Sequence, residues 1–566
     1  MKPLINAHTH IFSYKDVPPF VARGFIPFPF YLLTHFHFIF WIFRIYKKVK
    51  GVYYKVRDTR QKLLGLARSN FFTDFILLAF SLWIGMNAIY YILNWVNAIP
   101  DEGWIKDIIR TLTSYKLIWP SPPSFFKYLI VLTGLVVNKS LRSLLFKISK
   151  TLIKPLSYLP NEKTMGFIHR YLKIAAIANY KSQTTAYNKL YKMYPPGSRF
   201  VVLTMDMTYM NLTPPRKYYD QLDEVVKMMN GTSKNYKNII PFLFVDPRRI
   251  KNEADFFKWI FIDGKIVLED CQVKKYLEVG PFRGIKIYPA LGYYAFDELL
   301  LPLWLYCVQE EIPITTHCTV GSIYYRRRMK KEWFKHPVFK TRKGDPLDIY
   351  AARNIDIQKN FTNPLNYLVL VEPYFLKRLL ATCQKETQDL FGFKNINENL
   401  DRDLGKLKIN IAHYGGINQW QKFQESDRLE YAQEIMETPK VGIRLFAEQA
   451  RPENILPGKP AKLWREADWY SIISSLMLQY DGIYADISYI VHSTEIRPLL
   501  KMTLQNPDLS KKVLFGTDYY VVRNHKSEKQ LYAEMIDGFT EAQMDLMGRD
   551  NPNRFLKIKN DKKPLI

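Results

Sequence analysis

The C-terminal two thirds of the chain alternates short, almost wholly apolar runs with longer stretches of helical periodicity. The apolar runs are RFVVLTMD (199–206), NIIPFLFVD (238–246), GIKIYP (284–289), IPITTHC (312–318), LKINIAH (407–413), GIYADIS (482–488) and KVLFGTD (512–518). The helical stretches fall at 217–230, 295–310, 366–391 and 467–480. Apolar runs that do not alternate with polar residues are typical of parallel strands buried on both faces.

The N-terminal PLINAHTH reads as one more buried strand and brings the number of strands to eight. Eight β/α repeats predict a closed (β/α)8 barrel of the TIM type. An open, doubly wound sheet is the alternative, but it would usually carry a Gly-rich phosphate-binding turn after its first strand. No such turn follows PLINAHTH, so the barrel is the expected fold.

A long insertion separates the first strand from the second. Residues 11–198 are apolar, aromatic and basic, and their pattern is mostly helical. We therefore expect a barrel domain built from residues 1–10 and 199–566, and an insertion domain at 11–198. Three apolar stretches stand out in the insertion, at 25–46, 71–99 and 125–137. Residues 75–96 carry no charged side chain, and this stretch is long enough to span a bilayer.

The barrel limits how the insertion can meet a membrane. Because strand one must join the other strands, the insertion crosses a bilayer an even number of times or not at all. A two-crossing hairpin would place the Lys- and Arg-rich segment 47–69 on the side away from the barrel, against the positive-inside rule. The favoured arrangement is shallow: apolar faces within 25–150 enter one leaflet, and basic residues meet anionic headgroups. A helical subdomain packed on the barrel, or on a second copy in a homo-oligomer, is the alternative.

Composition and charge exclude some classes of protein and favour others. Among 566 residues, 48% are hydrophobic, which excludes a disordered protein. Lys and Arg number 81 against 53 Asp and Glu, a net charge of +28, and this surplus favours anionic partners. Nucleic acid is not expected, because no recognition motif accompanies the charge. Four cysteines without a CxxC motif, and no signal peptide, indicate a cytoplasmic protein or one peripheral on the inner face of the membrane.

Polar side chains gather where the predicted strands end: His8, His10, Asp206, Asp246, Lys286, His317, His413, Asp486 and Asp518. In a barrel these ends lie on the face that carries the chemistry. His8 and His10 are two residues apart on a strand, so both imidazoles project to one side. With the histidines that end strands five and six, and Asp518 after strand eight, they form a set suited to zinc, with manganese or iron as alternatives.

These motifs resemble a known family. NAHTHIF, PITTHC, INIAHYGG and VLFGTDYY are similar to the amidohydrolase superfamily. More narrowly, they resemble the amidohydrolase-related branch that includes aminocarboxymuconate semialdehyde decarboxylase. GIKIYPALGY and the C-terminal MGRDNPNRFLKI also look like that branch. The resemblance covers 1–12 and about 199–560.

The resemblance implies one divalent metal held by four ligands, His8, His10, His317 and Asp518. It places His413 beside the metal-bound water as base or orienter, and Asp518 would accept the proton of that water. Other members of the superfamily carry a carbamylated lysine that bridges two metals at the position of Lys286. A buried lysine paired with a carboxylate is the alternative. The acids Asp206, Asp246 and Asp486 would be second-layer or substrate contacts.

Three further features receive interpretations from the sequence. The basic stretch 324–343 follows strand five and would lie near the mouth of the site, where Arg326, Arg327 and Arg328 could bind an anion; a solvated loop is the alternative. His35 and His37 form a second HxH pair, but on a helix they point apart, so a structural role is expected. Cys318 is expected to be a packed thiol.

The expected function is that of a metal-dependent hydrolase. It would use a metal-activated water to attack a C–N or C–O bond of a small molecule, and an anionic or amphiphilic substrate fits the basic loop and the apolar insertion. Two alternatives stay open: a non-oxidative, metal-dependent decarboxylase, and a non-catalytic membrane-associated scaffold that keeps the barrel.

Overall fold

The computed structural model describes residues 2–16, 71–95, 103–137, 180, 182–210, 214–321, 323–341, 343–425, 430–445, 459–519 and 521–557. The chain divides into two compact units. Residues Met1–Leu32 and His169–Ile566 form the first, which we call the barrel unit, and Leu33–Ile168 form the second, which we call the helical unit.

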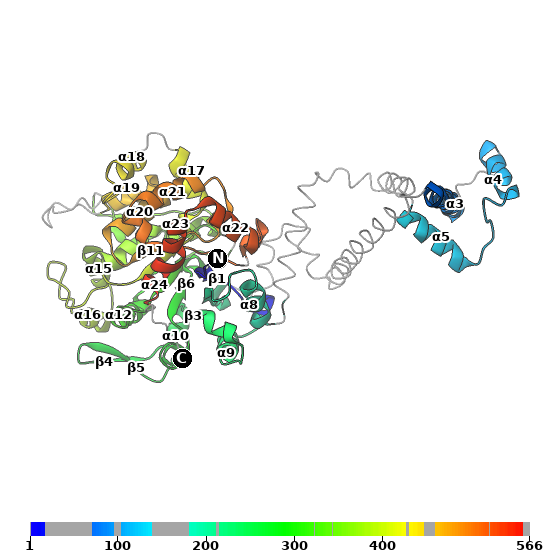
Figure 1. Cartoon of the computed structure of the whole chain (residues 1–566). Coiled ribbons are helices and arrows are strands. Elements are labelled where there is room, and N and C mark those ends of the chain that lie inside the picture. Colours follow the sequence, from blue (N-terminus) through cyan, green and yellow to red (C-terminus); the bar gives the residue numbers. More distant parts are fainter. Residues whose placement is uncertain are drawn as a thin grey trace. The chain divides into compact units, whose positions relative to one another are not determined.

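Eight parallel strands form the centre of the barrel unit (Figure 1). They are β1 (Ile5–Thr9), β2 (Arg199–Leu203), β3 (Ile239–Phe244), β6 (Gly284–Ile287), β7 (Ile314–His317), β10 (Ile409–Ala412), β11 (Ile483–Asp486) and β12 (Val513–Leu514), each paired with the next. The segment after β12 closes the ring onto β1: Thr9 and Tyr519 form a parallel bridge, and the Ala7 amide donates to the Phe515 carbonyl at 2.8 Å. The predicted (β/α)8 barrel is therefore confirmed.

Burial of both faces explains why the strands are apolar throughout. One cluster comes from alternate residues of neighbouring strands, including Val201, Leu203, Ile240 and Phe242, and it fills the inside of the barrel. The intervening residues, such as Phe200 and Val202, pack outward against helices. A strand buried on both faces has no polar positions to alternate, as the sequence indicates.

Helices and short turns connect the strands and surround the barrel (Figure 1). The α-helices of the barrel unit are α8 (Gln183–Tyr191), α9 (Tyr218–Met229), α10 (Pro247–Asn252), α11 (Gln272–Lys274), α12 (Leu301–Gln309), α13 (Asn354–Thr362), α14 (Leu368–Val371), α15 (Pro373–Leu380), α16 (Lys385–Phe391), α17 (Ile417–Glu425), α18 (Glu430–Glu437), α19 (Lys459–Glu466), α20 (Trp469–Gln479), α21 (Arg497–Gln505), α22 (Glu528–Gly538), α23 (Glu541–Asp545) and α24 (Asn551–Phe555). The expected helices at 217–230 and 467–480 correspond closely to α9 and α20.

Proline breaks the other two expected helices. The stretch 366–391 is not one helix but α14, α15 and α16, because Pro373 begins α15 and the side chain of Glu372 caps it. The stretch 295–310 forms a short 3-10 helix at Glu298–Leu300 and becomes α-helical only from Leu301, where Pro302 occupies the first turn of α12.

Helix α8 belongs to the barrel unit, although the sequence analysis places residues 183–191 in the insertion. Its buried residues Ala186, Tyr187 and Leu190 recur at helical spacing. The ring of Tyr187 meets that of Phe200 on β2 edge-on, with centroids 5.9 Å apart. The boundary between the units therefore falls before this helix rather than at residue 198.

Two antiparallel hairpins lie outside the barrel sheet. One joins β4 (Trp259–Ile262) to β5 (Lys265–Leu268), and the other joins β8 (Lys335–Lys340) to β9 (Pro346–Asp348). The turn between β4 and β5 is Asp263-Gly264, and both residues have positive φ, 50° and 76°, as a two-residue hairpin turn requires. The stretch 324–343 is thus partly a strand and not only a loop.

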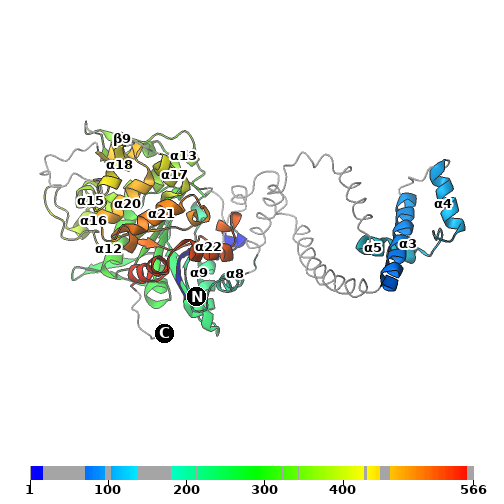
Figure 2. The ribbon, with the colours of Figure 1, turned by 45° about the horizontal axis from the view of Figure 1, so that its top comes forward.

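The described part of the helical unit contains α3 (Phe71–Trp95), α4 (Trp104–Ser114) and α5 (Ser124–Val137). Helices α3 and α5 pack through Ile84, Ala88, Tyr91, Ile130 and Val131. Figures 1 and 2 both show α4 apart from this pair. The expected apolar stretch 25–46, with His35 and His37, lies outside the described residues. Within the described ranges, no helix has both the length and the apolar character needed to cross a bilayer.

Candidate metal centre

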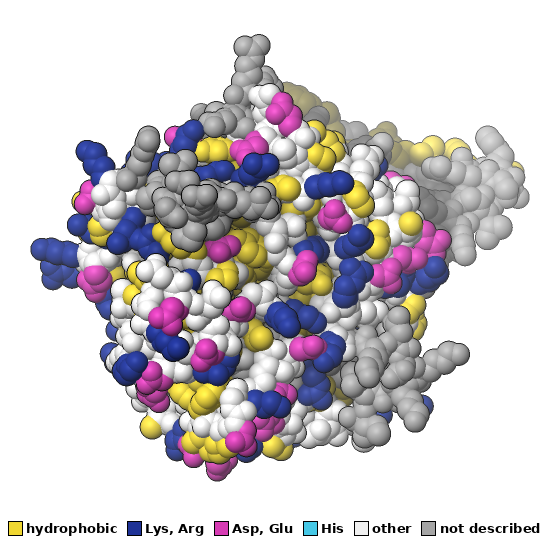
Figure 3. All heavy atoms as spheres, turned by 90° about the vertical axis from the view of Figure 1, so that its left-hand side faces the viewer, with side chains coloured by type: hydrophobic (Ala, Val, Ile, Leu, Met, Phe, Trp, Pro, Cys, Tyr) yellow, Lys and Arg dark blue, Asp and Glu magenta, His cyan; other side chains and the backbone are white. Residues whose placement is uncertain are grey.

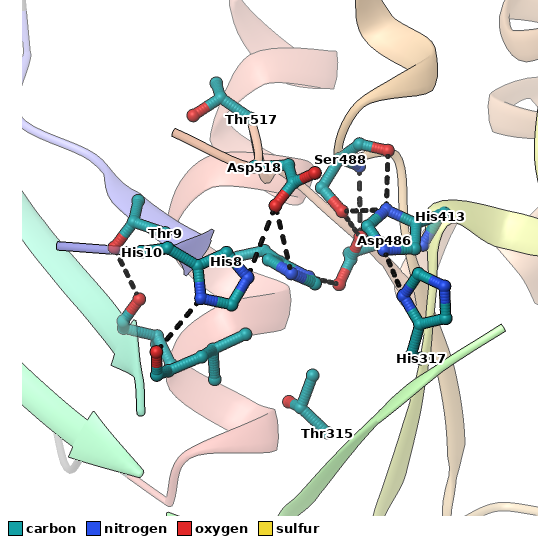
Figure 4. Close-up of polar contacts among 12 residues, drawn as sticks. His8, Thr9, His10, Thr315, His317, His413, Asp486, Ser488, Thr517 and Asp518 are labelled. Atoms are coloured by element: carbon teal, nitrogen blue, oxygen red, sulfur yellow. Dashed lines mark hydrogen bonds and ion pairs between the residues drawn. The ribbon is translucent and has the colours of Figure 1, made fainter. Parts of the chain in front are cut away.

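The barrel brings most of the sequence-predicted polar residues together where its strands end (Figure 4). His8 lies on β1 and His10 follows it, His317 ends β7, and His413 follows β10. Asp486 ends β11, and Asp518 follows β12. All of these side chains are buried, so the protein shields them from bulk water.

His8, His10 and Asp518 form one group whose candidate ligand atoms lie within 4.8 Å of one another. The Nε2 atom of His10 is 3.3 Å from Asp518 Oδ1, and the Nε2 atom of His8 is 3.6 Å from the same oxygen. Each imidazole is held by its other nitrogen. His10 donates Nδ1–H to the Leu203 carbonyl, and His8 donates Nδ1–H to Asp486 Oδ2, both at 3.0 Å. In the neutral imidazoles these bonds leave both Nε2 lone pairs facing Asp518.

Asp486 collects hydrogen bonds from four residues. Its Oδ2 accepts the Nδ1–H of His8 and the side-chain amide of Asn410, the latter at 2.7 Å. Its Oδ1 accepts the backbone N–H groups of His413 and Ser488, at 3.1 and 3.0 Å, and the hydroxyl of Ser488. Because these donors stabilise the charged form, they hold the pKa of Asp486 well below its usual range, although burial alone would raise that pKa.

His413 and His317 form a second pair beside this group (Figure 4). His413 Nδ1 lies 3.2 Å from the Ser488 carbonyl, which can only accept, so Nδ1 carries the hydrogen. His413 Nε2 then accepts the Nδ1–H of His317 at 3.0 Å. His317 Nε2 is left buried with no hydrogen-bond partner among the described residues, as is Nε2 of His8.

Lys286 lies on β6, fully buried, and its ammonium has no hydrogen-bond partner in the described part of the chain. Burial lowers the pKa of Lys286 to about 8, and the charges of Asp486 and Asp518 partly offset that effect. The ring of Tyr288, two residues further on, stacks on the imidazole of His317 with centroids 4.0 Å apart. Lys286 therefore interacts with the carboxylates of Asp486 and Asp518 through long-range charge and not through a direct ion pair.

His8, His317 and His413 are neutral because they are buried. Burial lowers the pKa of His8 to about 4 and holds the pKa of His317 well below its ordinary value. The pKa of His413 is lowered for the same reason. Asp518 is ionised: burial would raise its pKa, but the surrounding histidines, His10 first, bring it down. Neutral imidazoles beside carboxylates are the protonation states that bind a metal ion.

The backbone at two of these residues has an uncommon conformation. His413 and Asp518 both have positive φ, 63° and 59°, which costs free energy for a residue that is not glycine. Gly516 lies between β12 and Asp518, and a Cβ placed there would come within 2.9 Å of the Cβ of His8. The backbone is therefore strained at both strand ends, and the segment after β12 packs closely against β1.

The donor set fits a divalent metal ion. Two neutral Nε2 atoms converge on one ionised carboxylate oxygen, and lone pairs at such distances repel unless a cation or a proton lies among them. Two buried imidazole nitrogens without a hydrogen-bond partner are also costly unless a ligand satisfies them. Nitrogen and carboxylate donors suit zinc, and each imidazole has the second hydrogen bond that orients such ligands.

Two of the acids that the sequence places at strand ends form ion pairs with arginine instead of joining the metal centre. Asp206 accepts Arg249 Nε at 2.7 Å, and Asp246 caps α10 while forming an ion pair with Arg248. These acids are therefore neutralised by arginine. The thiol of Cys318 is buried and donates to the Thr362 carbonyl at 3.2 Å, which confirms a packed thiol.

The arginines after β7 lie on the surface. Arg327 and Arg328 are exposed, while Arg326 is half-buried and lies over the ring of Tyr324, 4.3 Å from its centroid. Asn354 pins this loop by donating to the Arg327 carbonyl at 2.6 Å. Their role in binding an anion stays a prediction.

Sequence reasoning missed Asn410, Ser488 and Tyr288. Asn410 and Ser488 hold Asp486, and Tyr288 stacks on His317. A signal for them exists, because each lies on or directly after a predicted strand. However, an amide, a hydroxyl and a phenol at such positions are also common in barrels without a metal, so the sequence alone does not single them out.

Comparison with known proteins gives a mixed result. No family model and no curated protein matches the chain. Several solved structures match. A 5-carboxyvanillate decarboxylase from Novosphingobium aromaticivorans, complexed with manganese, is 12% identical over 72% of this chain and 87% of its own, with a TM-score of 0.34.

Two hydrolases are among the other matches. An amidohydrolase from Burkholderia multivorans is 9% identical over 66% of this chain and 88% of its own, with a TM-score of 0.31. A putative 2-pyrone-4,6-dicarboxylic acid hydrolase from Pseudomonas putida is 9% identical over 69% of this chain and 95% of its own, with a TM-score of 0.32.

Proposed function

We propose that the protein is a metal-dependent hydrolase of the amidohydrolase type that cleaves a C–N or C–O bond. The observation that carries this proposal is the convergence of the buried side chains of His8 and His10 on Asp518 at the ends of the barrel strands. With His317 as the fourth donor, these residues would hold one divalent ion. When bound, zinc, or alternatively manganese or iron, supplies a Lewis acid that polarises a carbonyl and brings the pKa of water toward neutrality.

The chain supplies the proton carriers. Asp518 is ionised at neutral pH and can take a proton on a carboxylate oxygen. His413 is neutral, and Ser488 fixes its Nδ1. Its Nε2 accepts the Nδ1–H of His317, and it would accept or donate a proton only after that hydrogen bond is released. Burial of both groups excludes competing water and strengthens their interaction with a developing charge.

The substrate class is argued from charge. Lys286 is a buried cation near Asp486 and Asp518, and the exposed Arg327 and Arg328 belong to the loop that follows β7. A substrate with an anionic group would meet both. An anionic or amphiphilic ester, lactone or amide is therefore the first choice for a substrate screen.

Metal analysis of the full-length protein tests the proposal. We expect about one zinc or manganese per chain, and its loss in His10→Ala and Asp518→Ala, because each removes one ligand of a small set. Asp537→Ala, at an exposed position on α22, is the control and should keep its metal. Failure to bind metal, even when it is supplied during expression, would leave a non-catalytic scaffold as the better reading.

Product analysis then separates the two chemistries. Hydrolysis adds water to the substrate, so the product gains one oxygen atom from solvent. Release of CO2 with no added oxygen would instead identify a decarboxylase. If metal analysis finds two ions per chain, Lys286 would be a carbamylated ligand that bridges them. The variant Lys286→Met should then bind only one ion per chain.

A further inference from the structure

The helical unit carries an apolar surface that the metal centre does not use. We propose that this surface enters one leaflet of an anionic lipid bilayer and anchors the protein peripherally. The proposal is independent of the catalytic one, since it concerns only residues of α3, α4 and α5.

Large apolar side chains are exposed along the N-terminal half of α3, from Phe72 to Leu82. Phe75, Leu78 and Leu82 are 63%, 59% and 55% exposed, and their spacing of three and four residues places them on the same face. On α5, Phe125 and Leu132 are 70% and 61% exposed. Single exposed apolar residues are ordinary, but a set of this size on neighbouring helices marks an interaction surface.

Two polar side chains of α3 are buried and form hydrogen bonds to the segment before α5. Asn87 is buried; its side-chain amide donates to the carbonyls of Trp83 and Leu117 at 2.9 Å, and its carbonyl accepts the Trp119 amide at 2.8 Å. The Tyr91 hydroxyl donates to the Trp119 carbonyl at 2.5 Å. The irregular segment before α5 is therefore satisfied from within, while apolar side chains face outward.

Helix α4 has the pattern of a helix that lies at a membrane surface. Its apolar side chains recur at helical spacing and form one face: Ile105, Ile108, Ile109 and Leu112. Lys106 and Arg110 lie on the other face, and no residue of this helix is buried. An amphipathic helix without a protein partner places its apolar face in the interface and its cations near the headgroups.

Tryptophan and tyrosine flank α4 at both ends. Trp104 begins the helix and Tyr115 caps its end, and they are 72% and 74% exposed. Trp119, in the segment that leads to α5, is also exposed. These side chains have an apolar body and a polar edge, so they favour the depth of the headgroups.

Charge decides between a bilayer and a second copy of the chain. The described part of the helical unit contains four basic residues, Lys106, Arg110, Lys116 and Lys127, and two acids, Asp74 and Asp107. Two such surfaces would repel each other, and the whole chain carries +28. Anionic headgroups attract it instead. The barrel unit differs, because both signs of charge are interspersed over the face seen in Figure 3.

The length of the exposed run limits the depth of insertion. From Phe72 to Leu82, α3 rises by about 15 Å at ~1.5 Å per residue, which is about half of a hydrocarbon core of roughly 30 Å. The exposed apolar segment of α3 therefore fits within one leaflet, whatever the angle between the helix and the membrane. This depth also agrees with the absence of a spanning helix among the described residues.

Vesicle flotation of the full-length protein tests the proposal. We expect flotation with vesicles of equal parts phosphatidylcholine and phosphatidylglycerol, and weaker flotation with phosphatidylcholine alone. The triple variant Phe75→Gln, Leu78→Gln, Leu82→Gln should bind at least about tenfold less, because each side chain contributes more than ~1 kcal/mol when buried. Glutamine favours helix, so α3 should persist.

A matched control uses exposed apolar residues of the barrel unit. The double variant Val279→Gln, Ile396→Gln, at positions 81% and 44% exposed, should float like the wild type. No flotation of the wild type would overturn the proposal, as would equal flotation of the triple variant. Light scattering could instead show that the wild type is a dimer and the triple variant a monomer, while neither protein floats. That result would assign the surface to contact with a second copy of the chain.

Discussion

Asp486 links the two halves of the metal centre at the scale of a single residue. It accepts from the imidazole of His8 and from the backbone and hydroxyl of Ser488, so it fixes the tautomer of one candidate ligand and the position of the residue that holds His413. Partners of this kind orient a ligand and raise its basicity. The sequence marks Asp486 only as a polar residue at a strand end.

We expect Asp486→Asn to weaken metal binding by about tenfold to a hundredfold. The amide offers one acceptor where the carboxylate offers two, and it places N–H groups against existing donors. Competition with a chromophoric chelator measures the affinity. Asp246→Asn is the matched control, because Asp246 is equally buried at a strand end but pairs with Arg248. If both variants keep wild-type affinity, Asp486 does not orient the ligands.

His336 provides a pH prediction away from the metal centre. It is buried, its Nδ1 accepts the amides of Val338 and Phe339 at 3.1 and 2.8 Å, and its Nε2–H donates to Asn366 at 3.1 Å. Burial lowers its pKa to about 3 from the ordinary 6.5. Below pH 6.5 the unfolded chain therefore binds a proton that the folded chain does not, and stability falls as the pH falls toward 3.

The variant His336→Asn should lose part of this pH dependence, because asparagine can accept the same amides but does not titrate. Between pH 7 and pH 5 the free energy of unfolding should fall by about 2 kcal/mol less than in the wild type. Denaturant titrations with excess chelator at both pH values measure this difference. Identical pH dependence in both proteins would show that His336 is not held neutral.

At the scale of elements, the approach of β12 to β1 depends on Gly516. A Cβ at this position would lie 2.9 Å from the Cβ of His8 and 3.1 Å from the Cβ of Ser488. We expect Gly516→Ala to destabilise the barrel by about 1–3 kcal/mol, as overpacking does, and to weaken metal binding by displacing His8. Thermal unfolding and chelator competition measure the two effects. Gly538→Ala, with no atom closer than 3.9 Å, should change neither.

The eight strands could be predicted from the sequence because each is buried on both faces, which leaves a continuous apolar run. The histidines and Asp518 could be placed because they end such runs. The hairpins were missed, although Asp263-Gly264 between β4 and β5 is a strong turn signal. The broken helix at 366–391 was missed because the apolar periodicity continues past Pro373, where backbone hydrogen bonding does not.

Contacts between distant segments could not be predicted in the same way. The bonds from His8 and Asn410 to Asp486 join residues more than 70 positions apart, and only the closed barrel sets their distances. Residues 183–191 have a helical pattern in the sequence, but nothing in that pattern says that Tyr187 packs on β2. Spacing along the chain reports local structure, while partners across the barrel depend on register and closure.

At the scale of the whole molecule, chemistry and anchoring fall in different units. Every proposed ligand belongs to the barrel unit, whereas the exposed apolar helices belong to Leu33–Ile168. A chain in which residues 33–168 are replaced by a short Gly/Ser linker should therefore keep about one metal and lose vesicle flotation. A shorter connection also costs less closure entropy between β1 and α8, so the barrel should lose no stability. Metal analysis, thermal unfolding and flotation check these outcomes. A folded variant without metal would mean that the insertion completes the site, and the two roles would then have to be treated as one.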